Sequence, residues 1–474
     1  MEFEKKALDM YGEVIINKSL VQKAGFSARS IPTYVGEWIL FNFIEDGILT
    51  NESRVKVSNF IDRFLPQKGE KEEVKNRLIN MEPVKLLDDY SVSINLQSGT
   101  RYLRIPFLDI NDAIVSQKII EDNNLLLGSG VWGVGELFYV PPENEKDKGS
   151  VLMRNFKPFQ IGAVDIDYFI ECRKHFGLDE WLDLIISSMG FNPTIYSLEQ
   201  KFVLITRIVA FVEPRINLIE LAPKGTGKSF VYDNFSRYAR VVRGGKITPA
   251  VMFFHHVRNT PGLISKYDTV VLDEIQSIQT DSELSAGLKT YLESGKFSRG
   301  DTEATSEAGF VMLGNIPLDK NRNPLNLDKG LLKDFPNFLQ ETAFLDRLHG
   351  IIPGWYMPRV TSETPSQMMG FKGDFLSEVL HVLRGRSDFS DYVAGNMKLK
   401  NCKDLRDTKA IQRLATGFLK ILFPDISLTK KEFLEYCLKP AIELRQRVRD
   451  ELHKMDPEYK KIKIGYEEDY YNND

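Results

Sequence analysis

The chain has 474 residues, of which 42% are hydrophobic and 27% charged, with a formal net charge of −4. These values are typical of an ordinary soluble globular protein with room for about two to four domains. Because acidic and basic residues are both abundant, the net charge neither predicts nor excludes a nucleic-acid partner.

The cysteines and the apolar stretches exclude several classes of protein. The cysteines are far apart and form no CxxC pair, so we expect buried thiols rather than a disulfide or a metal site at Cys172, Cys402 and Cys437. The first residues, MEFEKKALDM, lack the apolar core of a secretory signal. The most apolar window, residues 202–212, contains Arg207 and is too short to span a bilayer. We therefore expect a cytoplasmic protein without a membrane partner.

Residues 1–106 are expected to form a mixed α+β domain. Apolar spacing and chain breaks predict three helices, at residues 34–44, 53–64 and 70–81. Residues 85–105 then alternate like strands around a turn at 97–100, which predicts a β-hairpin. Three helices and a hairpin are the elements of a winged helix-turn-helix, although many other mixed domains share them. Arg101 and Arg104 on the hairpin are candidate contacts to DNA phosphates, or else residues of a solvated strand edge.

Residues 107–192 are expected to form a β-rich and helical linking domain. The stretch 125–140 is dense in glycine, and together with 151–153 it suggests the tightly bent strands of a small β-barrel or an extended sheet. Helices are expected at 165–188 and 197–211, and the second of them leads into the next domain.

A candidate phosphate-binding loop follows the apolar run INLIEL, residues 216–221, which has the composition of a buried parallel strand. Proline ends this strand because it has no N–H to donate. The next segment predicts a P-loop, in which backbone N–H groups and a helix N-terminus surround the β-phosphate of ATP; its residues are Ala222, Pro223, Lys224, Gly225, Thr226, Gly227, Lys228 and Ser229. Lys228 would contact the β- and γ-phosphates, and Ser229 would bind Mg²⁺. Ala222 stands where the motif usually has its first glycine.

A second buried strand, residues 266–274, ends in two carboxylates, Asp273 and Glu274. The ligands of open α/β sheets bind at the carboxyl edge of the strands, so this strand is expected to bring both carboxylates to the P-loop. Asp273 would hold Mg²⁺ through water, and Glu274 would polarise the water that attacks ATP.

Two further groups complete the ATPase core that we expect at residues 193–358. A third strand, residues 309–315, ends in Asn315, whose amide can bind the attacking water or the γ-phosphate. Arg347 offers a positive fork suited to a transferring phosphoryl group. These parts, taken in order, predict an α/β P-loop ATPase.

Between the second and third strands, a helix is expected to end at Gly295 and a projecting hairpin to follow it. Lys296, Phe297 and Arg299 make this hairpin basic and aromatic, which suits a threaded nucleic-acid strand or peptide. The alternative is a surface loop that packs on a neighbouring subunit.

The pattern of residues 359–455 is mainly helical and predicts a lid after the α/β core, which is the arrangement of AAA+ proteins. Arg413 is the candidate nucleotide-sensing arginine of this lid. Residues 456–474 are acidic and aromatic and are expected to form a frayed tail.

The motifs GTGKS, SRG, LGN, AFLDRLH, PGW and RDTKAI together resemble the Lon-like AAA+ proteins of the bacterial BREX phage-defence systems, the BrxL family. YVGEWIL, KPFQIG and DEWLDLIISSMGF extend the resemblance over most of the chain. The resemblance implies an ATP- and Mg²⁺-dependent protein that forms a hexameric or double ring. It also implies binding to duplex DNA without sequence specificity, a part in resistance to phage, and other defence proteins as further partners. The family's lid arginine corresponds to Arg413 or to the position of Gln412.

Two functions remain open at this point. The first is an ATP-driven ring that binds or translocates on DNA, and the alternative is a protein-remodelling ATPase, a Lon relative without its protease. Longer members of the family carry a peptidase domain with a Ser-Lys dyad after the lid. We expect no peptidase activity here, because no Gly-x-Ser segment with a later lysine follows the lid.

Overall fold

The computed structural model describes residues 2–24, 31–44, 49–96, 98–142, 144, 147–159, 163–255, 260–299 and 302–472. The chain forms two units. We call residues 1–15, 165–371 and 376–474 the sheet unit, and residues 16–164 and 372–375 the barrel unit. Within the described ranges, no helix is both long enough and apolar enough to cross a bilayer.

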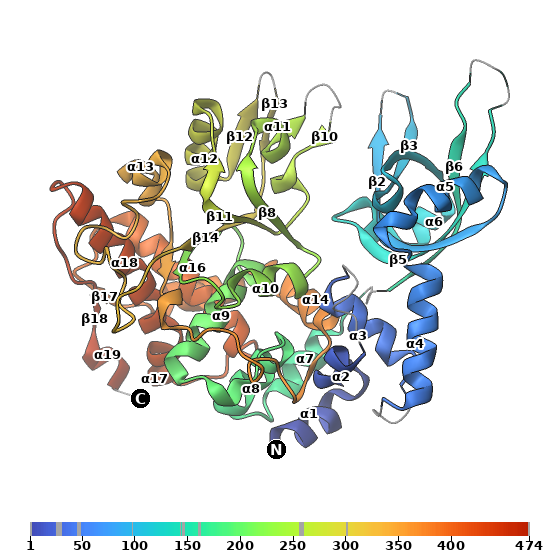
Figure 1. The fold of residues 1–474 in the computed structure, drawn as a ribbon. Coiled ribbons are helices and arrows are strands. Elements are labelled where there is room, and N and C mark those ends of the chain that lie inside the picture. The colour runs from blue at the N-terminus through green and yellow to red at the C-terminus, as the bar shows by residue number, and fades with distance from the viewer. Residues whose placement is uncertain are drawn as a thin grey trace. The chain divides into compact units, whose positions relative to one another are not determined.

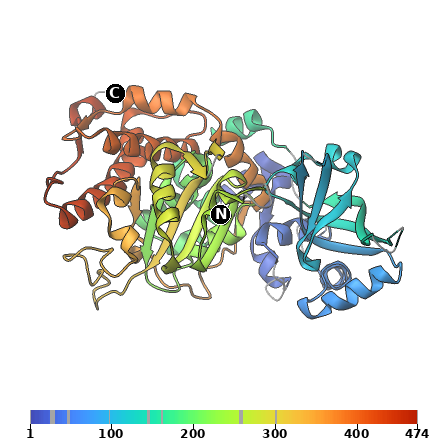
Figure 2. The same ribbon diagram turned by 90° about the horizontal axis from the view of Figure 1, so that it is seen from above.

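The sheet unit is built on five parallel strands in the order β15-β7-β14-β11-β8, of which β14, β11 and β8 are labelled in Figure 1. Figure 2 shows the green and yellow strands of this sheet side by side. Their bounds are Asn217–Ala222 (β7), Ala239–Lys246 (β8), Thr269–Gln279 (β11), Gly309–Asn315 (β14) and Gly350–Ile352 (β15). All of β7 is buried, as in a strand covered on both faces. Because β14 lies between β7 and β11, the three strands expected from the sequence end next to one another.

Helices surround this sheet, and some of them begin at a side-chain cap. The side chain of Ser197 accepts from the Gln200 N–H, and the Gln200 side chain accepts from the Ser197 N–H, which is a capping box. At the other end of a helix, Gly295 adopts a left-handed φ of 70°, and the helix stops there as predicted. The helices are α1 (Glu2–Tyr11), α7 (Ile166–Arg173), α8 (Leu178–Ser188), α9 (Leu198–Val212), α10 (Lys228–Asn234), α11 (Pro249–Met252), α12 (Ser282–Ser294) and α13 (Thr342–Leu345).

The core of the sheet unit joins strands and helices that are distant in sequence. Ile219 on β7, Val270 on β11 and Phe310 on β14 pack in one buried cluster with Tyr291 of α12 and Val448 of the C-terminal region. Apolar burial of this kind is the main stabilising term in a domain of this size.

The C-terminal region of the sheet unit is helical, as predicted. Its elements are α14 (Gly373–Arg384), α15 (Asp388–Asn396), α16 (Leu405–Leu422), α17 (Lys430–Glu432), a π-helical turn (Phe433–Leu438), α18 (Lys439–Met455) and α19 (Glu468–Asn472). α16 packs against α9 and α18, and α18 packs against β15. These helices therefore cover the flank of the sheet that ends in β15.

The prediction of a frayed tail at 456–474 is wrong for the part of the tail that the structure describes. Strand β18 (Gly465–Tyr466) pairs with β17 (Leu399–Lys400). Tyr471 is buried, and its hydroxyl donates to the carbonyl of Asn396 at 2.9 Å. The acidic composition of the segment predicted a solvated tail, but the buried Tyr471 holds the segment against the helices.

The barrel unit contains the expected helices and hairpin, but in a different arrangement. The helices are α3 (Thr33–Phe41), α4 (Asn51–Phe64) and α5 (Lys71–Ile79). The hairpin strands join three others in a closed barrel of order β2-β3-β4-β6-β5. The bounds are Val84–Asn95 (β2), Thr100–Ile105 (β3), Ile110–Val115 (β4), Val131–Val140 (β5) and Ser150–Pro158 (β6), with α6 (Gln117–Asp122) between β4 and β5. The hairpin is thus part of a barrel wall rather than a wing, and the barrel runs across the boundary expected between residues 106 and 107.

Glycines let the barrel close tightly. A Cβ atom at Gly133 would lie 2.5 Å from the carbonyl oxygen of Lys157, and one at Gly135 would lie 2.7 Å from the Tyr90 hydroxyl. Only glycine tolerates such approaches. The glycine density that suggested bent strands has this physical cause.

Candidate nucleotide-binding site

The P-loop connects the end of β7 to the start of α10. Gly225 and Gly227 have φ values of 79° and 72°, in the left-handed region that favours glycine. A Cβ atom at Gly227 would also lie 3.2 Å from the ring of Phe191. The loop is tied down at Gly225, whose carbonyl accepts from the N–H of Val360 at 2.8 Å. The glycines of the motif are therefore required by the backbone that forms here.

Lys228 lies at the centre of the candidate site. Its side chain is buried, and Nζ donates to Oδ1 of Asn315 at 2.6 Å. Burial lowers the pKa of this lysine from its ordinary value, while the carboxylates of Glu220 and Asp273 act in the opposite direction. The structure thus brings together the P-loop lysine and the amide at the end of β14, two groups that lie far apart in the sequence.

Asp273 and Glu274 lie on β11, next to this pair. Asp273 is buried, and its Oδ1 accepts from the backbone N–H of Glu274 at 2.9 Å. Arg243, its partner residue on β8, has Nε at 3.9 Å from Asp273 Oδ2. Glu274 is exposed and has a φ of 52°, a conformation that non-glycine residues rarely adopt. Such strain is typical of functional sites, and here it accompanies the bulge that interrupts β11 after Asp273.

A cavity of about 570 Å³ opens beside the loop and is lined by Pro223, Lys224 and Asn315. Two arginines that the sequence analysis did not select, Arg322 and Arg359, also line it. Arg359 directly precedes Val360, whose N–H donates to the carbonyl of Gly225. The position of Arg359 shortly after the PGW motif was the sequence signal that could have identified it.

A buried ion pair lies beneath the loop. Arg207 of α9 donates to both carboxylate oxygens of Glu220, from Nε at 3.0 Å and from Nη2 at 2.7 Å, and both side chains are 0% exposed. Gly354 of the PGW motif packs against this carboxylate. A Cβ atom there would lie 2.7 Å from Glu220 Oε1 and 2.6 Å from the Cβ of Ala222. Gly354 therefore leaves room for the methyl group of Ala222, which stands where the motif usually has a glycine.

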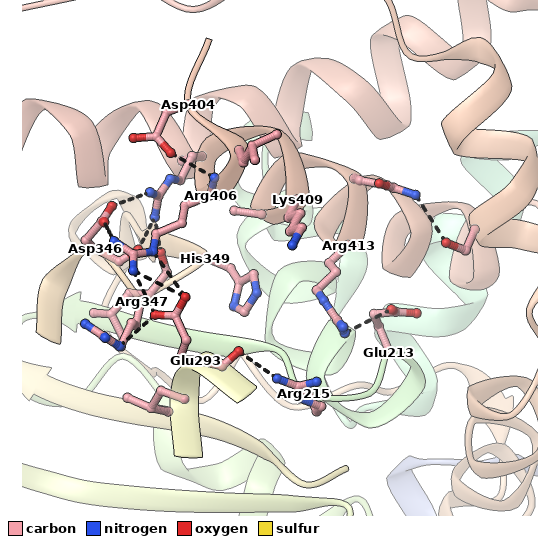
Figure 3. Close-up of a pocket in the computed structure, with 17 residues that line it drawn as sticks. Glu213, Arg215, Glu293, Asp346, Arg347, His349, Asp404, Arg406, Lys409 and Arg413 are labelled. Carbon is pink, nitrogen blue, oxygen red and sulfur yellow. Dashed lines mark hydrogen bonds and ion pairs between the residues drawn. The ribbon is translucent and has the colours of Figure 1, made fainter. Parts of the chain in front are cut away.

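Arg347 and Arg413 lie at the opposite edge of the sheet. They line a cavity of about 720 Å³ together with Arg215, Arg406 and Lys409 (Figure 3). This cavity adjoins the amino end of β7, where His349 Nδ1 accepts from the N–H of Asn217 at 2.9 Å. At the rise per residue of a β-strand, the six residues of β7 place the two edges of the sheet about 17 Å apart. Neither arginine can therefore contact a phosphate held by the P-loop of its own chain.

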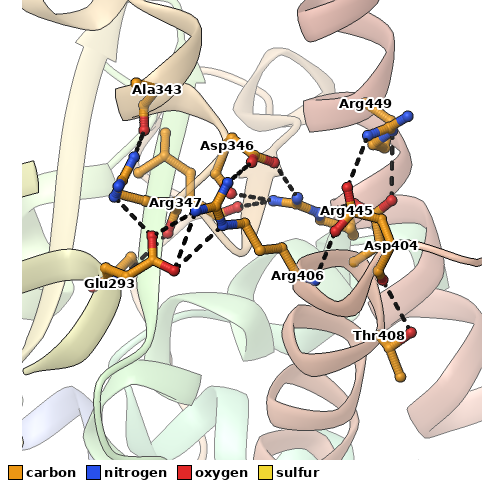
Figure 4. Close-up of polar contacts among 12 residues, drawn as sticks. Glu293, Ala343, Asp346, Arg347, Asp404, Arg406, Thr408, Arg445 and Arg449 are labelled. Carbon is orange, nitrogen blue, oxygen red and sulfur yellow. Dashed lines mark hydrogen bonds and ion pairs between the residues drawn. The ribbon is translucent and has the colours of Figure 1, made fainter. Parts of the chain in front are cut away.

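Carboxylates hold the arginines of this cavity in place (Figure 4). Glu293 Oε2 lies 2.9 Å from Nε of Arg347 and 3.0 Å from Nη2 of Arg406. Asp346 pairs with Arg406 at 2.6 Å and with the buried Arg445 at 2.8 Å. Arg406 was not selected from the sequence, although it begins the RDT segment that was compared with the family.

Arg413 has partners on the chain that leads into β7. Its Nη1 donates to the carbonyl of Pro214 at 2.6 Å and lies 3.6 Å from Oε1 of Glu213. Arg413 lies at this edge because α16, which carries it, packs against α9.

The end of α12 is fixed at the same edge. Arg215 Nη2 donates to the carbonyl of Glu293 at 2.8 Å, and Asn217 Nδ2 donates to that of Leu292 at 3.2 Å. The hairpin of β12 (Lys296–Arg299) and β13 (Thr302–Thr305) follows directly.

The candidate DNA-contacting residues lie on two separate elements. Lys296 is exposed on β12, and Arg299 ends that strand. Phe297 differs from the expectation, because its ring is buried and stacks on Phe253 at 5.5 Å between centroids. Gly300 and Asp301 lie outside the described residues. Arg101 and Arg104 are exposed on β3 of the barrel.

The parallel sheet, the P-loop after β7 and the Asp-Glu pair on β11 define a P-loop ATPase domain with an AAA+-like α/β fold. The model of the ATPase domain of BrxL-like Lon-like proteases matches residues 151–465. The model of the N-terminal domain of the BREX system Lon protease-like protein BrxL matches residues 9–139. The chain therefore belongs to the BrxL family of BREX-associated Lon-like proteins, which confirms the resemblance drawn from its motifs.

Individual relatives agree with this assignment. The chain is 33% identical over 450 residues to the Lon-like protease BrxL of Escherichia coli O9:H4 (strain HS). It is 30% identical over 445 residues to the Lon-like protease BrxL of Bacillus cereus (strain H3081.97). Each comparison covers 93% of this chain but only 63% and 65% of the two relatives. An uncharacterized protein of Acidianus filamentous virus 1, ORF426, is 24% identical over 258 residues, which cover 48% of this chain and 59% of that protein.

Proposed function

We propose that this chain hydrolyses ATP within a hexameric or double ring of its own copies, and that the ring acts on DNA in bacterial defence against phage. The observation that carries the proposal is the division of the candidate catalytic groups between two edges of one sheet. Lys228, Asn315, Asp273 and Glu274 lie at the carboxyl edge, whereas Arg347 lies at the amino edge.

The groups at the carboxyl edge suit a nucleoside triphosphate. Gly225 and Gly227 give the loop the backbone that a phosphate cradle needs. Lys228 has a buried ammonium whose hydrogen bond goes to a neutral amide, so an entering phosphate would meet a partly desolvated cation. Ser229 and Asp273 would hold Mg²⁺, which neutralises phosphate charge when it is bound. Glu274 is the exposed carboxylate that would orient the attacking water.

The groups at the amino edge suit a nucleotide bound by a neighbouring copy. Arg347 has a side chain 20% exposed that donates to the backbone carbonyl of Ala343 and pairs with the carboxylate of Glu293. A phosphate brought by another subunit could replace this partner, because both present oxygens to the same guanidinium. Arg413 faces the same cavity, so we assign it to the neighbour's nucleotide as well, rather than to that of its own chain.

DNA is favoured over a polypeptide as the partner of the hairpin. An aromatic grip on a threaded chain would require an exposed ring, but Phe297 is 4% exposed and packed in the core. The exposed residue beside it is Lys296, a cation. A cation repeated around a ring channel would attract a polyanion even though the net charge of each chain is −4. We further propose that the protein works in the cytoplasm, without a membrane partner, and with other proteins of the defence system.

The proposal is tested by measuring phosphate release from ATP with no addition, with duplex DNA and with an unfolded protein. We expect duplex DNA of any sequence to stimulate hydrolysis and the unfolded protein to have no effect. Stimulation by the unfolded protein alone would establish the remodelling function instead.

A further inference from the structure

The barrel has the connectivity of a known oligonucleotide-binding barrel. Its five strands follow the order β2-β3-β4-β6-β5, β4 and β6 are parallel, and α6 lies between β4 and β5. Barrels of the OB type bind oligonucleotides on the face of their second and third strands, with help from the first and last hairpin loops. The second and third strands of this barrel are β3 and β4.

A row of apolar side chains runs around the outer surface of the barrel, from β3 over β4 and β6 to β5. Leu103, Ala113, Leu137 and Met153 are buried inside the barrel. The residues next to them in sequence point outward, since successive side chains of a strand alternate between its faces. We call these the outer row: Tyr102 on β3, Ile114 on β4, Leu152 on β6 and Phe138 on β5.

The register places three members of the outer row side by side. Ile114 pairs with Leu152, and Leu152 pairs with Phe138. Ile114 is 43% exposed, and the other three side chains are partly exposed. By contrast, Trp132 at the other end of β5 packs against a helical cluster. The outer row is thus an aromatic and aliphatic strip that is partly exposed to solvent.

Cations flank the strip. The guanidinium of Arg154 lies 3.8 Å from the centroid of the Phe138 ring, a stacked cation–π contact. Arg104 is exposed on the same side of β3 as Tyr102, and Asp112 is the exposed carboxylate beside Ile114. Flat rings with neighbouring arginines are the surface that binds single strands, because unpaired bases stack on rings and guanidinium planes while phosphates meet the charges.

We propose that the outer row, with Arg104 and Arg154, binds a single-stranded nucleic acid, with bases stacked on Tyr102 and Phe138. A duplex cannot use the rings in this way because its bases are already stacked on one another. The site rests on the proposed action on DNA and deepens it, since it specifies an unpaired strand and a surface separate from the hairpin of β12 and β13.

The test compares Tyr102→Leu and Phe138→Leu with the full-length chain. The probe is a labelled oligo-dT of about 20 nucleotides, titrated at several salt concentrations and followed by fluorescence anisotropy. Each substitution is expected to weaken binding by about 5- to 150-fold, the fold-change that follows from removing one base stack at about 1–3 kcal/mol. The dependence of affinity on salt should stay unchanged, because no charge is removed. Arg154→Gln should instead reduce the slope of log K against log salt by about 0.7.

Controls keep this result separate from folding and from the proposed function. Tyr168→Leu removes a tyrosine that is 55% exposed on the sheet unit and should bind oligo-dT as the wild type does. Duplex DNA should still stimulate ATP hydrolysis in Phe138→Leu. If duplex DNA does not stimulate hydrolysis in the wild type, that result counts against the ring proposal and not against the barrel site. Wild-type affinity for oligo-dT in correctly folded Tyr102→Leu and Phe138→Leu would overturn the barrel site. A change in oligomer size without a change in oligo-dT affinity would also overturn it and would show that the row joins copies of the chain.

Discussion

Replacing Glu220 by leucine would leave the guanidinium of Arg207 buried without its partner. Both side chains are 0% exposed and share two hydrogen bonds, of 2.7 and 3.0 Å. Removing one member of such a pair costs about 3–5 kcal/mol, because the remaining charge stays uncompensated in a medium of low polarity. At about 2–4 °C per kcal/mol for a domain of a few hundred residues, the sheet unit should melt roughly 6–20 °C lower. Arg207→Met should have a similar effect.

The double substitution Arg207→Met with Glu220→Leu should recover most of this stability, since two apolar side chains of similar volume need no charged partner. Calorimetry of the wild type, both single variants and the double variant gives the coupling free energy. Lys289→Met serves as the control, because it breaks an ion pair whose members are 29% and 44% exposed and should cost at most about 1 kcal/mol. If the losses in free energy of unfolding of the two single variants simply add in the double variant, the reasoning is refuted.

Three further predictions test the assignments of these residues. Lys228→Ala should abolish ATP binding, which nucleotide titration measures. Glu274→Gln should bind ATP normally but hydrolyse it at least about 100-fold more slowly, because only the stabilisation of the transition state is removed. Phosphate release measures this rate, and a wild-type rate in Glu274→Gln would contradict the role of Glu274. Inactive Arg347→Ala mixed with inactive Lys228→Ala should partly regain hydrolysis, and no recovery in rings shown to be mixed would place Arg347 outside the neighbour's site. Lys296→Ala combined with Arg299→Ala should lower the slope of log K against log salt by about 0.9 for each duplex phosphate that these side chains neutralise in the wild type, with ATP binding intact. Unchanged affinity and slope would exclude this hairpin as a DNA-binding element.

The parts of the site that follow from local sequence could be predicted. The apolar run before Pro223 required a buried strand. The strand that ends at Asn315 is the neighbour of β7 in the sheet, and the strand that carries Asp273 lies one position further along. Parallel α/β sheets collect such strand ends at one edge, so the sequence order was sufficient to bring these residues together.

The parts that depend on packing between distant elements could not be predicted. The side of the sheet on which Arg413 lies is decided by the packing of α16 on α9, which no local pattern encodes. The barrel closes through the pairing of β2 with β5 and of β4 with β6, so the hairpin signal was correct while the wing inferred from it was not confirmed. The hairpin segment with Phe297 had the basic and aromatic composition of a loop that binds a threaded chain, but Phe297 is buried in the cluster that contains Tyr291.

The end of α12 also connects the arginine cavity to the hairpin of β12 and β13. The carboxylate of Glu293 restrains Arg347 and Arg406, and the hairpin begins three residues later, at Lys296. In the ring proposed above, a shift of the hairpin would move this carboxylate relative to Arg347, whereas Arg406 would keep its second partner, Asp346. In the opposite direction, a neighbour's phosphate that replaced Glu293 on Arg347 would leave the end of α12 held by Arg215 and Asn217 through backbone carbonyls. The proposed ring would therefore couple the position of the hairpin to the availability of Arg347 through one carboxylate.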